Sequence, residues 1–466
     1  MTNSTAFALA RRVAPRSSPT IDEGAKLLGL ALPMTATALV NMGMSITDVA
    51  MMGRIGPEAV AAGAIVSDLY SIVYYLGAGA LAAVAPELAQ AIGAGRGRLV
   101  RRVTQQGLWM AAVLAVFALA LLWHSSAFLG WAGIDPAIVG LSEGYARMMA
   151  VTAVPMMGLA VWRCVYAAAG SPRAILIATI AALPANAALD YVLMFGGFGI
   201  PALGLTGAGL ASALVAAGMF AGLAAHTRFC EATRGYRILE RFAPPDRRRL
   251  AALLRLGIPM GISGFTEVGV FLISTLLAGM FGPEALAAHA ITLRMAGVIY
   301  ALPLGLSQAA TVRVGLAVGA GDPHAVARAV RAVLVLGLAA GSSIFLALAS
   351  SRHAIPWLFL SADGAGAGEA ARAAAFLLAV LSAIALAQGV GVVSSGALRG
   401  FKDARVPMAM SVFAFWGVGF STIVLLAFAG GSGVEGIWLG IAAGAAANAA
   451  LAALRLGWRM RRAVSG

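Results

Sequence analysis

The stretch G-R-I-G-P-E-A-V-A-A-G-A-I at residues 53–65 recurs as G-M-F-G-P-E-A-L-A-A-H-A-I at residues 279–291. Nine of the thirteen positions are identical, and the two copies lie 226 residues apart. The same offset relates three further pairs: Pro33 and Pro259, Tyr74 and Tyr300, and 93–95 and 319–321. Self-similarity at a fixed offset is the signature of a repeated structural unit. The sequence therefore predicts one structural unit that is present twice along the chain.

The composition indicates that this unit is embedded in lipid. Of the 466 residues, 61% are hydrophobic and 11% are charged, and the mean hydropathy is +0.89. A soluble domain is about 45–50% apolar and about 25% charged. Apolar runs long enough to cross a bilayer as helices recur along the chain, and no period-two alternation typical of a barrel is evident. We therefore expect an all-α integral membrane protein with these twelve transmembrane helices, to within several residues: 27–52, 59–92, 101–123, 138–168, 172–195, 204–228, 252–280, 286–318, 326–350, 369–399, 404–428 and 433–458.

Basic residues gather in alternate connections between these spans. The basic connections and tail contain Arg96, Arg98, Arg101, Arg102, eight arginines from Arg228 to Arg255, Arg399, Lys402, Arg405, Arg455, Arg459, Arg461 and Arg462. The intervening connections contain almost none. This asymmetry is typical of cytoplasmic loops. It predicts an inner (plasma) membrane protein of a bacterium with both termini in the cytoplasm. The net charge of +14 is thus a topology signal, which argues against nucleic acid as a partner and favours contact with lipid headgroups.

An even number of spans per unit means that both copies enter the membrane in the same direction. The units are then two parallel six-helix repeats related by an axis along the membrane normal. We expect a cytoplasmic N-terminal segment at 1–26, an N-lobe at 27–228, a basic cytoplasmic linker at 229–251, a C-lobe at 252–458 and a cytoplasmic C-terminal tail at 459–466. Two such lobes can rock around a central cavity, which favours transport over a rigid scaffold.

Four polar residues of the N-lobe are expected at one depth in the membrane. Asp48 lies about 7 Å from the outer end of the first span. Asn186 and Asp190 share a helix face because they are four residues apart, and Thr206 opens the sixth span from the same side. Such oxygen atoms suit a proton shared by two carboxylates, or a hard cation such as sodium at Asp48 and Asp190. A water-satisfied polar cap is the alternative, and Thr206 could simply cap a helix.

A single carboxylate in the C-lobe, that of Glu267, is expected near the bilayer midplane. A charge there is costly unless water, a cation or a proton relieves it. The repeat pairs Glu267 with Asn41, and it pairs Asp48 with Ser274. The two lobes therefore differ where their chemistry would differ. His289 replaces Gly63 of the first copy, and we expect it to be an interhelical hydrogen-bonding residue.

Oppositely charged residues also occupy equivalent positions in the two repeats. Asp68 corresponds to Arg294, and Glu87 corresponds to Arg313. Since equivalent positions lie at equal depth, these two pairs are candidate ion pairs between the lobes; partners within each lobe are the alternative. Pro33 interrupts the first span, where it removes a helical hydrogen bond and predicts a bend.

The motifs together resemble the multidrug and toxic compound extrusion (MATE) family, of the NorM-like or DinF-like kind, over nearly the whole chain. The motifs that resemble the family are Pro33 with Asp48, the two G-P-E-A copies, N-x-x-x-D-Y through P-x-L-G-x-T-G-A-G at 186–209, and G-A-L-R-G-x-K-D at 396–403. The resemblance implies export of cationic or amphipathic drugs driven by inward flow of protons or sodium. It implies a cation site at the positions of Asp48, Asn186, Asp190 and Thr206, and a substrate or secondary proton role for Glu267, with Asn41 and Gln388 as auxiliary residues.

One departure from the family bears on the coupling ion. NorM-like relatives often carry an Asp where this chain has Gln388. A sodium site built on two acids in the C-lobe is therefore disfavoured, which favours protons and leaves sodium in the N-lobe open. We find no phosphate loop, nucleophile–base arrangement or metal-spaced His cluster, so we expect no enzyme activity and no cofactor. We expect a monomer.

Three other classes compete with this interpretation. A major facilitator transporter should carry an Asp-Arg signature in its second-to-third loop, where this chain has A-G-R-G-R-L-V-R-R. A lipid-linked precursor flippase of the same superfamily should have a cationic cavity and more spans. A non-transporting membrane scaffold would leave the intramembrane acids without a purpose.

Overall fold

The computed structural model describes residues 19–197, 199–240, 242–361 and 366–465. Twelve helical segments in these ranges are long and apolar enough to cross a membrane. Apart from an isolated bridge between Gly197 and Ile200, the described ranges contain no β-structure. The predicted all-α fold with twelve membrane-spanning helices is therefore confirmed.

The first six spans form one helical bundle. Its members are α2 (Pro19–Ile55), α3 (Pro57–Leu81) with its continuation α4 (Val84–Gly93), α5 (Gly97–Trp123), α7 (Pro136–Ala168), α8 (Arg173–Phe195) and α9 (Leu205–His226). The short helices α6 (Ser125–Trp131) and α10 (Glu231–Arg234) connect them. Trp162 and Tyr166 are fully buried at the centre of its largest apolar core.

The last six spans form the second bundle. Its members are α11 (Arg247–Ala278) with η1 (Gly279–Phe281), α12 (Pro283–Ala320), α13 (Pro323–Ser351), α14 (Ala367–Gly400), the segment α15 (Arg405–Val412), η3 (Phe413–Phe420), α16 (Ser421–Ile423) and η4 (Val424–Ala429), and α17 (Gly433–Ser465). The 3₁₀ turn η2 (Ile355–Leu358) precedes α14, and η3 and η4 are π-helical. α2 begins eight residues before the expected 27, and α17 continues through the expected tail as far as Ser465.

The repeated G-P-E-A sequence starts the second span of each bundle. Pro57 and Pro283 occupy the first helical turn, where the missing N–H costs nothing and φ is already suited to a helix. The glycines before them, Gly56 and Gly282, have φ of 153° and 97°, which favours glycine over any residue with a side chain. The motif thus forms the same sharp helix–helix corner twice.

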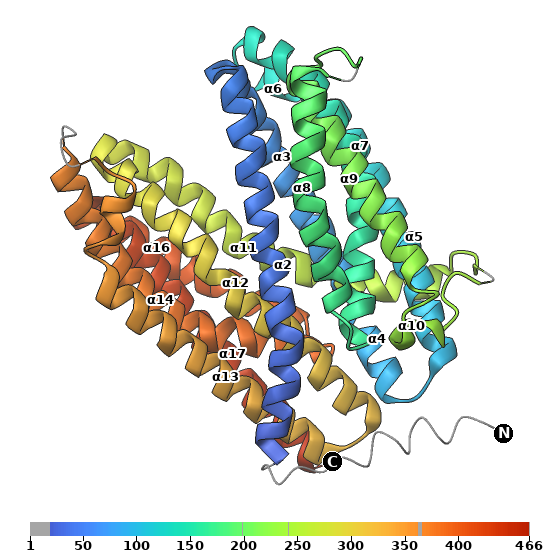
Figure 1. The fold of residues 1–466 in the computed structure, drawn as a ribbon. Coiled ribbons are helices and arrows are strands. Elements are labelled where there is room, and N and C mark those ends of the chain that lie inside the picture. Colours follow the sequence, from blue (N-terminus) through green and yellow to red (C-terminus); the bar gives the residue numbers. More distant parts are fainter. Residues whose placement is uncertain (1–18, 198, 241, 362–365, 466) are drawn as a thin grey trace.

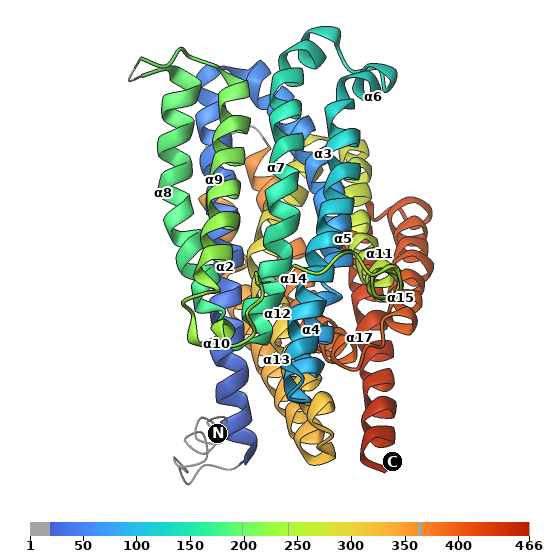
Figure 2. The same cartoon turned by 90° about the vertical axis from the view of Figure 1, so that its right-hand side faces the viewer.

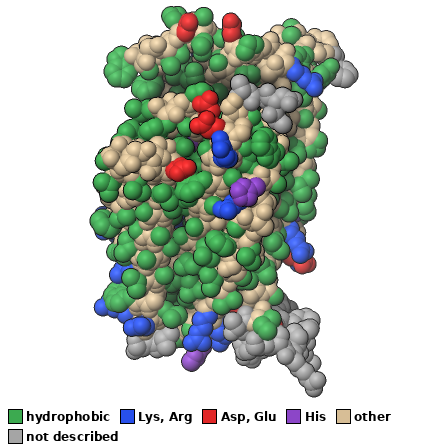
Figure 3. Space-filling model, turned by 90° about the vertical axis from the view of Figure 1, so that its left-hand side faces the viewer, with side chains coloured by type: hydrophobic (Ala, Val, Ile, Leu, Met, Phe, Trp, Pro, Cys, Tyr) green, Lys and Arg blue, Asp and Glu red, His purple; other side chains and the backbone are tan. Residues whose placement is uncertain are grey.

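The two bundles pack closely at one end and diverge at the other (Figures 1 and 2). We call the first the joined end; α2 begins and α17 ends there. We call the opposite end, where α6 lies, the splayed end. On the face shown in Figure 3, most Lys and Arg side chains lie at mid-height or toward the joined end, while acidic side chains lie mainly in the half nearer the splayed end.

Glycine makes the close approach at the joined end possible. A Cβ atom added to Gly319 of α12 would overlap the backbone of Gln90 in α4, and one added to Gly93 would overlap the carbonyl of Leu316. A Cβ at Gly257 of α11 would likewise overlap the carbonyl of Ala80. The two backbones are therefore in direct contact where the bundles meet.

Ion pairs also link the two bundles at the joined end, but their partners differ from those expected. Glu87 pairs with Lys402 over 2.9 Å rather than with Arg313. Nε and Nη2 of Arg313 donate to the carboxylate oxygens of Glu23 over 2.6 and 2.7 Å. The predicted Glu87–Arg313 pair is therefore wrong, although each residue forms an ion pair across the two bundles.

The other predicted pair is also wrong. Asp68 and Arg294, both within the described ranges, form no ion pair with each other. Asp68 is exposed on α3. Residues at equal depth in two related bundles need not face each other. The repeat fixes their depth but not the direction in which their side chains point.

The segment between the bundles is tied to α5. Gln105 and Gln106, nearly fully buried, donate to the carbonyls of Ile238 and Pro244 over 2.8 and 3.0 Å. Trp109 donates its indole N–H to the carbonyl of Ala243 over 3.0 Å. These contacts give hydrogen-bond partners to three polar side chains that follow the basic start of α5.

We predict that Gly319→Val will weaken the joined end, because its side chain would have to displace the backbone of Gln90. Overpacking of this kind costs about 1–3 kcal/mol. Spin labels on α4 and α12 should report a longer or broader distance distribution in the variant. Gly218→Val on α9 is the control, since a Cβ there meets no atom within 4 Å. Unchanged distances in the Gly319 variant would contradict the prediction.

Candidate functional site

Asn186 joins two carboxylates inside the first bundle. Its Nδ2 donates to Oδ1 of Asp48 on α2 and to Oδ2 of Asp190 on α8, each over 2.6 Å. Asp190 is fully buried, Asn186 is 1% exposed and Asp48 is half-buried. The structure therefore brings three of the four predicted N-lobe residues into one cluster, which we call the Asp48–Asp190 cluster.

The helices explain this arrangement. Asn186 and Asp190 are one turn apart on α8, so their side chains point to the same side of the helix. α2 packs along α8 and presents Asp48 to that side. The two carboxyl groups are also close enough to interact directly. Two ionised carboxylates at this range repel, so a proton or a cation between them lowers the energy of the cluster.

Two buried oxygen atoms of the cluster remain without hydrogen-bond donors. Oδ1 of Asn186 and Oδ1 of Asp190 are both buried and make no hydrogen bond in the structure. A buried acceptor without a donor is costly. Carboxylate and amide oxygens are the ligands of protons and hard cations, so the donor set fits either ion.

Thr206 lies outside the cluster. Its hydroxyl lies against Gly144 of α7, where an added Cβ would overlap it, and it forms no hydrogen bond with Asp48, Asn186 or Asp190, all of which the structure describes. Tyr145 of α7 was not among the predicted site residues. It interacts electrostatically with both carboxylates, and its hydroxyl shares a 3.1 Å hydrogen bond with that of Ser67. A tyrosine hydroxyl in a helix otherwise rich in apolar residues is the feature of the sequence that could have identified Tyr145 as a site residue.

A second carboxylate lies in the other bundle. The hydroxyl of Tyr300 on α12 donates to Oε2 of Glu267 on α11 over 3.2 Å. Nε2 of Gln388 on α14 reaches Oε1 of Glu267 over 3.5 Å. Glu267 thus connects three helices of the second bundle, and Gln388 contacts it as the sequence suggested.

Arg399 supplies positive charge to this second site. Its guanidinium lies close enough to Glu267 and Tyr300 to interact electrostatically with both. Arg399 was expected in a basic connection, but it lies in the last turn of α14. Asn41 on α2, the repeat partner of Glu267, forms no hydrogen bond with any residue of the two sites within the described ranges.

His289 is a structural residue, as expected. Its Nδ1 accepts a 3.1 Å hydrogen bond from the indole of Trp438, and its Nε2 lies 3.0 Å from the hydroxyl of Thr275. A nitrogen that accepts an N–H bond carries no proton, so the ring is a neutral imidazole bridging α11, α12 and α17.

Solved structures share this architecture of two six-helix bundles. The crystal structure of the eukaryotic MATE transporter AtDTX14 matches 96% of this chain and 99% of its own, with a TM-score of 0.83 and 20% identity. A MOP superfamily transporter from Pyrococcus furiosus matches with the same TM-score at 18% identity, over 96% and 99% of the two chains. The fold is therefore that of the MATE transporters.

Sequence comparisons assign the family. The MatE family model matches residues 33–192 and 259–425, two segments that begin 226 residues apart, which is the offset of the internal repeat. A probable multidrug resistance protein NorM of Mesorhizobium japonicum is 39% identical over 91% of each chain. The corresponding protein of Bradyrhizobium diazoefficiens is 38% identical over 95% of each. The chain belongs to the MatE family, whose members are membrane transporters and not enzymes.

We predict that Asn186→Ala will lower thermal stability more at pH 8 than at pH 5. The variant removes the donor that bridges two carboxylates, and the resulting repulsion is relieved when the carboxyl groups are protonated. An unmet buried acceptor costs about 1–3 kcal/mol. Asn448→Ala is the control, because Asn448 is a buried Asn whose hydrogen bond among the described residues is with Ser411 and not with a carboxylate. Equal losses at both pH values for Asn186→Ala would contradict the prediction.

Proposed function

We propose that the protein is a secondary active multidrug exporter that couples inward flow of protons to outward transport of cationic or amphipathic small molecules. The Asp48–Asp190 cluster carries this proposal, because it places two interacting carboxyl groups and two unmet oxygen acceptors inside a membrane-spanning bundle. The names of the NorM relatives support the choice of drugs as substrates. Thr206 is not included in the proposed coupling site.

Glu267 is proposed to bind substrate or a second proton. Its carboxylate is half-buried, and Tyr300 and Gln388 donate hydrogen bonds to its two oxygens. A cationic substrate near this carboxylate would gain Coulomb energy that a neutral one would not, because screening in such a cavity is weak.

We further propose that the joined end faces the cytoplasm. The basic connections identified in the sequence lie at this end, which is the distribution expected of cytoplasmic loops in a bacterial inner membrane. The structure would then be outward-facing. Transport would require the bundles to separate at the joined end, as a rocking motion between two parallel repeats does.

The coupling ion is proposed to be the proton, with sodium as the alternative. A sodium ion at Glu267 would have a neutral amide oxygen from Gln388 instead of a second carboxylate. In the Asp48–Asp190 cluster, two carboxyl groups accept from the same amide nitrogen, and one proton would relieve their repulsion without dehydration of a metal ion. Its unmet carboxylate and amide oxygens are also the kind of ligand that sodium takes, which makes sodium the alternative.

We predict that Asp48→Asn will abolish efflux of a cationic dye from a drug-sensitive host at unchanged protein level. The change removes the exchangeable charge and keeps the side-chain volume. Asp135→Asn is the matched control, since Asp135 is an exposed helix cap at the same end and Asn caps a helix equally well. Normal efflux by the Asp48 variant would remove the cluster from the mechanism.

We predict that purified protein in liposomes will export dye when only a pH gradient is imposed. Dye release should require the side into which drug is released to be the more acidic, since protons then flow in the opposite direction. A sodium gradient at equal pH is the control arm. Export driven by sodium alone, and indifferent to pH, would replace the proton by sodium as the coupling ion.

A further inference from the structure

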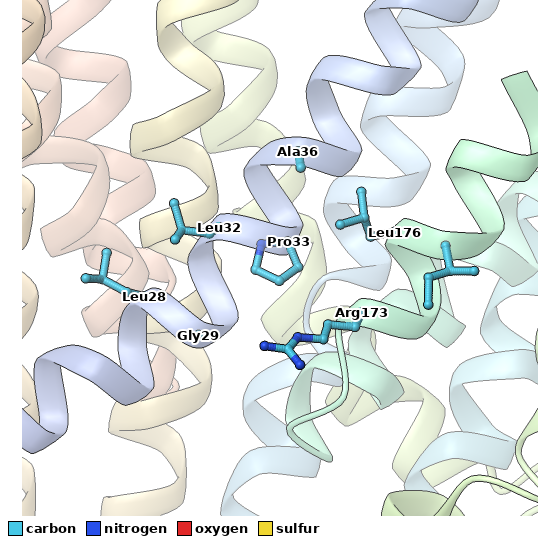
Figure 4. A pocket seen from close by; sticks show the side chains of 8 residues that line it. Leu28, Gly29, Leu32, Pro33, Ala36, Arg173 and Leu176 are labelled. Carbon is cyan, nitrogen blue, oxygen red and sulfur yellow. The ribbon is translucent and has the colours of Figure 1, made fainter.

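A groove runs along the outside of the protein between α2 and α8, near the joined end (Figure 4). Its first part has a volume of about 410 Å³, and apart from Arg173 its lining side chains are apolar. Leu32, Pro33 and Ala36 contribute one wall, and Leu176 and Ile177 contribute the other. Leu32 and Ile177, one on each wall, are 55% and 67% exposed, so both walls would face hydrocarbon in a bilayer.

A second cavity of about 470 Å³ continues the groove toward the end of the bundle. Both cavities are lined by Gly29 and Arg173, so they are adjacent. The second is also lined by Lys26 of α2 and by Arg313 and Leu316 of α12. α12 belongs to the second bundle, so the groove extends across the boundary between the two bundles.

Positive charge is concentrated at this second part, although Arg173 is shared with the first. Lys26, Arg173 and Arg313 line it, and Glu23 is the acidic residue paired with Arg313. Lys26 lies 3.9 Å from the same carboxylate, with its side chain 60% exposed. Arg173 forms no ion pair with any residue that the structure describes. Three cations and one carboxylate leave a surplus of two positive charges at the end of an apolar channel.

We propose that this groove binds one anionic phospholipid, with an acyl chain along Leu32 and Ile177 and the phosphate between Lys26 and Arg173. An apolar channel that ends in cations at the membrane surface is complementary to a lipid of one leaflet, tail inward and headgroup outward. A cationic drug would be repelled by the three basic side chains, and a free phosphate would leave the apolar channel unused.

The position of the groove gives the bound lipid a consequence for conformation. The headgroup would contact α2 and α8 of the first bundle and lie beside Arg313 and Leu316 of the second. Separation of the bundles at the joined end would take Arg313 away from this site. The lipid would therefore bind more tightly to the conformation described here than to one in which the joined end is open.

The test is a titration of the purified protein in a neutral detergent, followed by native mass spectrometry and thermal unfolding. Phosphatidylglycerol should bind one molecule per protein more tightly than phosphatidylcholine with the same acyl chains, and should raise the unfolding temperature. Equal binding of both lipids would overturn the proposal. So would equal protection by inorganic phosphate, since the apolar channel would then contribute nothing.

Variants separate the two parts of the groove. Lys26→Gln and Arg173→Gln should each weaken binding of phosphatidylglycerol about fivefold, as expected for one cation at a membrane surface. Gly29→Leu should weaken binding by filling the channel without changing the charge; a Cβ at Gly29 meets no atom within 4 Å, so the side chain fits. Arg102→Gln is the control, because Arg102 is exposed on α5, which does not line the groove. A loss with Arg102→Gln equal to that with Arg173→Gln would mean that general surface charge, and not this groove, attracts the lipid.

Discussion

The hydrocarbon of a bilayer offers no hydrogen bonds, and this constraint governs the whole structure. Every backbone group must be satisfied within the protein, so the described chain is almost entirely helical. Many buried hydroxyls are satisfied within their own helix, as those of Thr179 and Thr292 are. The unmet oxygens of Asn186 and Asp190 are two of the eight buried side-chain atoms without a hydrogen-bond partner in the described residues, and the only two that belong to a carboxylate or a carboxamide. Their cost is understandable if an ion occupies the cluster during part of the transport cycle.

The two bundles have kept their backbone and diverged in their chemistry. Ser274, the repeat partner of Asp48, bonds to the carbonyl of Phe271 on its own helix and so takes no part in a polar site. Glu267 stands where the first bundle has Asn41. Positions 41 and 48 are seven residues apart, which is about 10 Å along a helix. The acids of the two bundles therefore lie at different depths, and one lobe can titrate while the other handles a different ligand.

The sequence predicted the fold well because hydrophobic length and an internal repeat are properties of the chain itself. It predicted the association of Asp48, Asn186 and Asp190 because depth in a membrane and spacing on a helix restrict where these side chains can lie. It failed for Thr206, because depth does not fix the direction in which a side chain points around its helix. It failed for Glu87 and Arg313 because their partners, Lys402 and Glu23, lie in connecting and leading segments where the repeat symmetry does not hold. Tyr145 and Tyr300 were missed because aromatic residues are usual in any membrane helix.

α2 belongs to both bundles at once. Near its start, Glu23 is paired with Arg313, and Leu27 and Ala31 pack in one apolar core with Leu306 and Ala309 of α12. Beyond its middle, Asp48 is held by α8 and Met52 packs in the core of the first bundle. The two ends of α2 are thus held by different bundles. Rotation of one bundle against the other would therefore bend α2. The bend would form where the helix is least stiff. That point is the turn before Pro33, which lacks one backbone hydrogen bond. The ease with which the two bundles could rotate would then depend on a proline that lies between the two points where α2 is held.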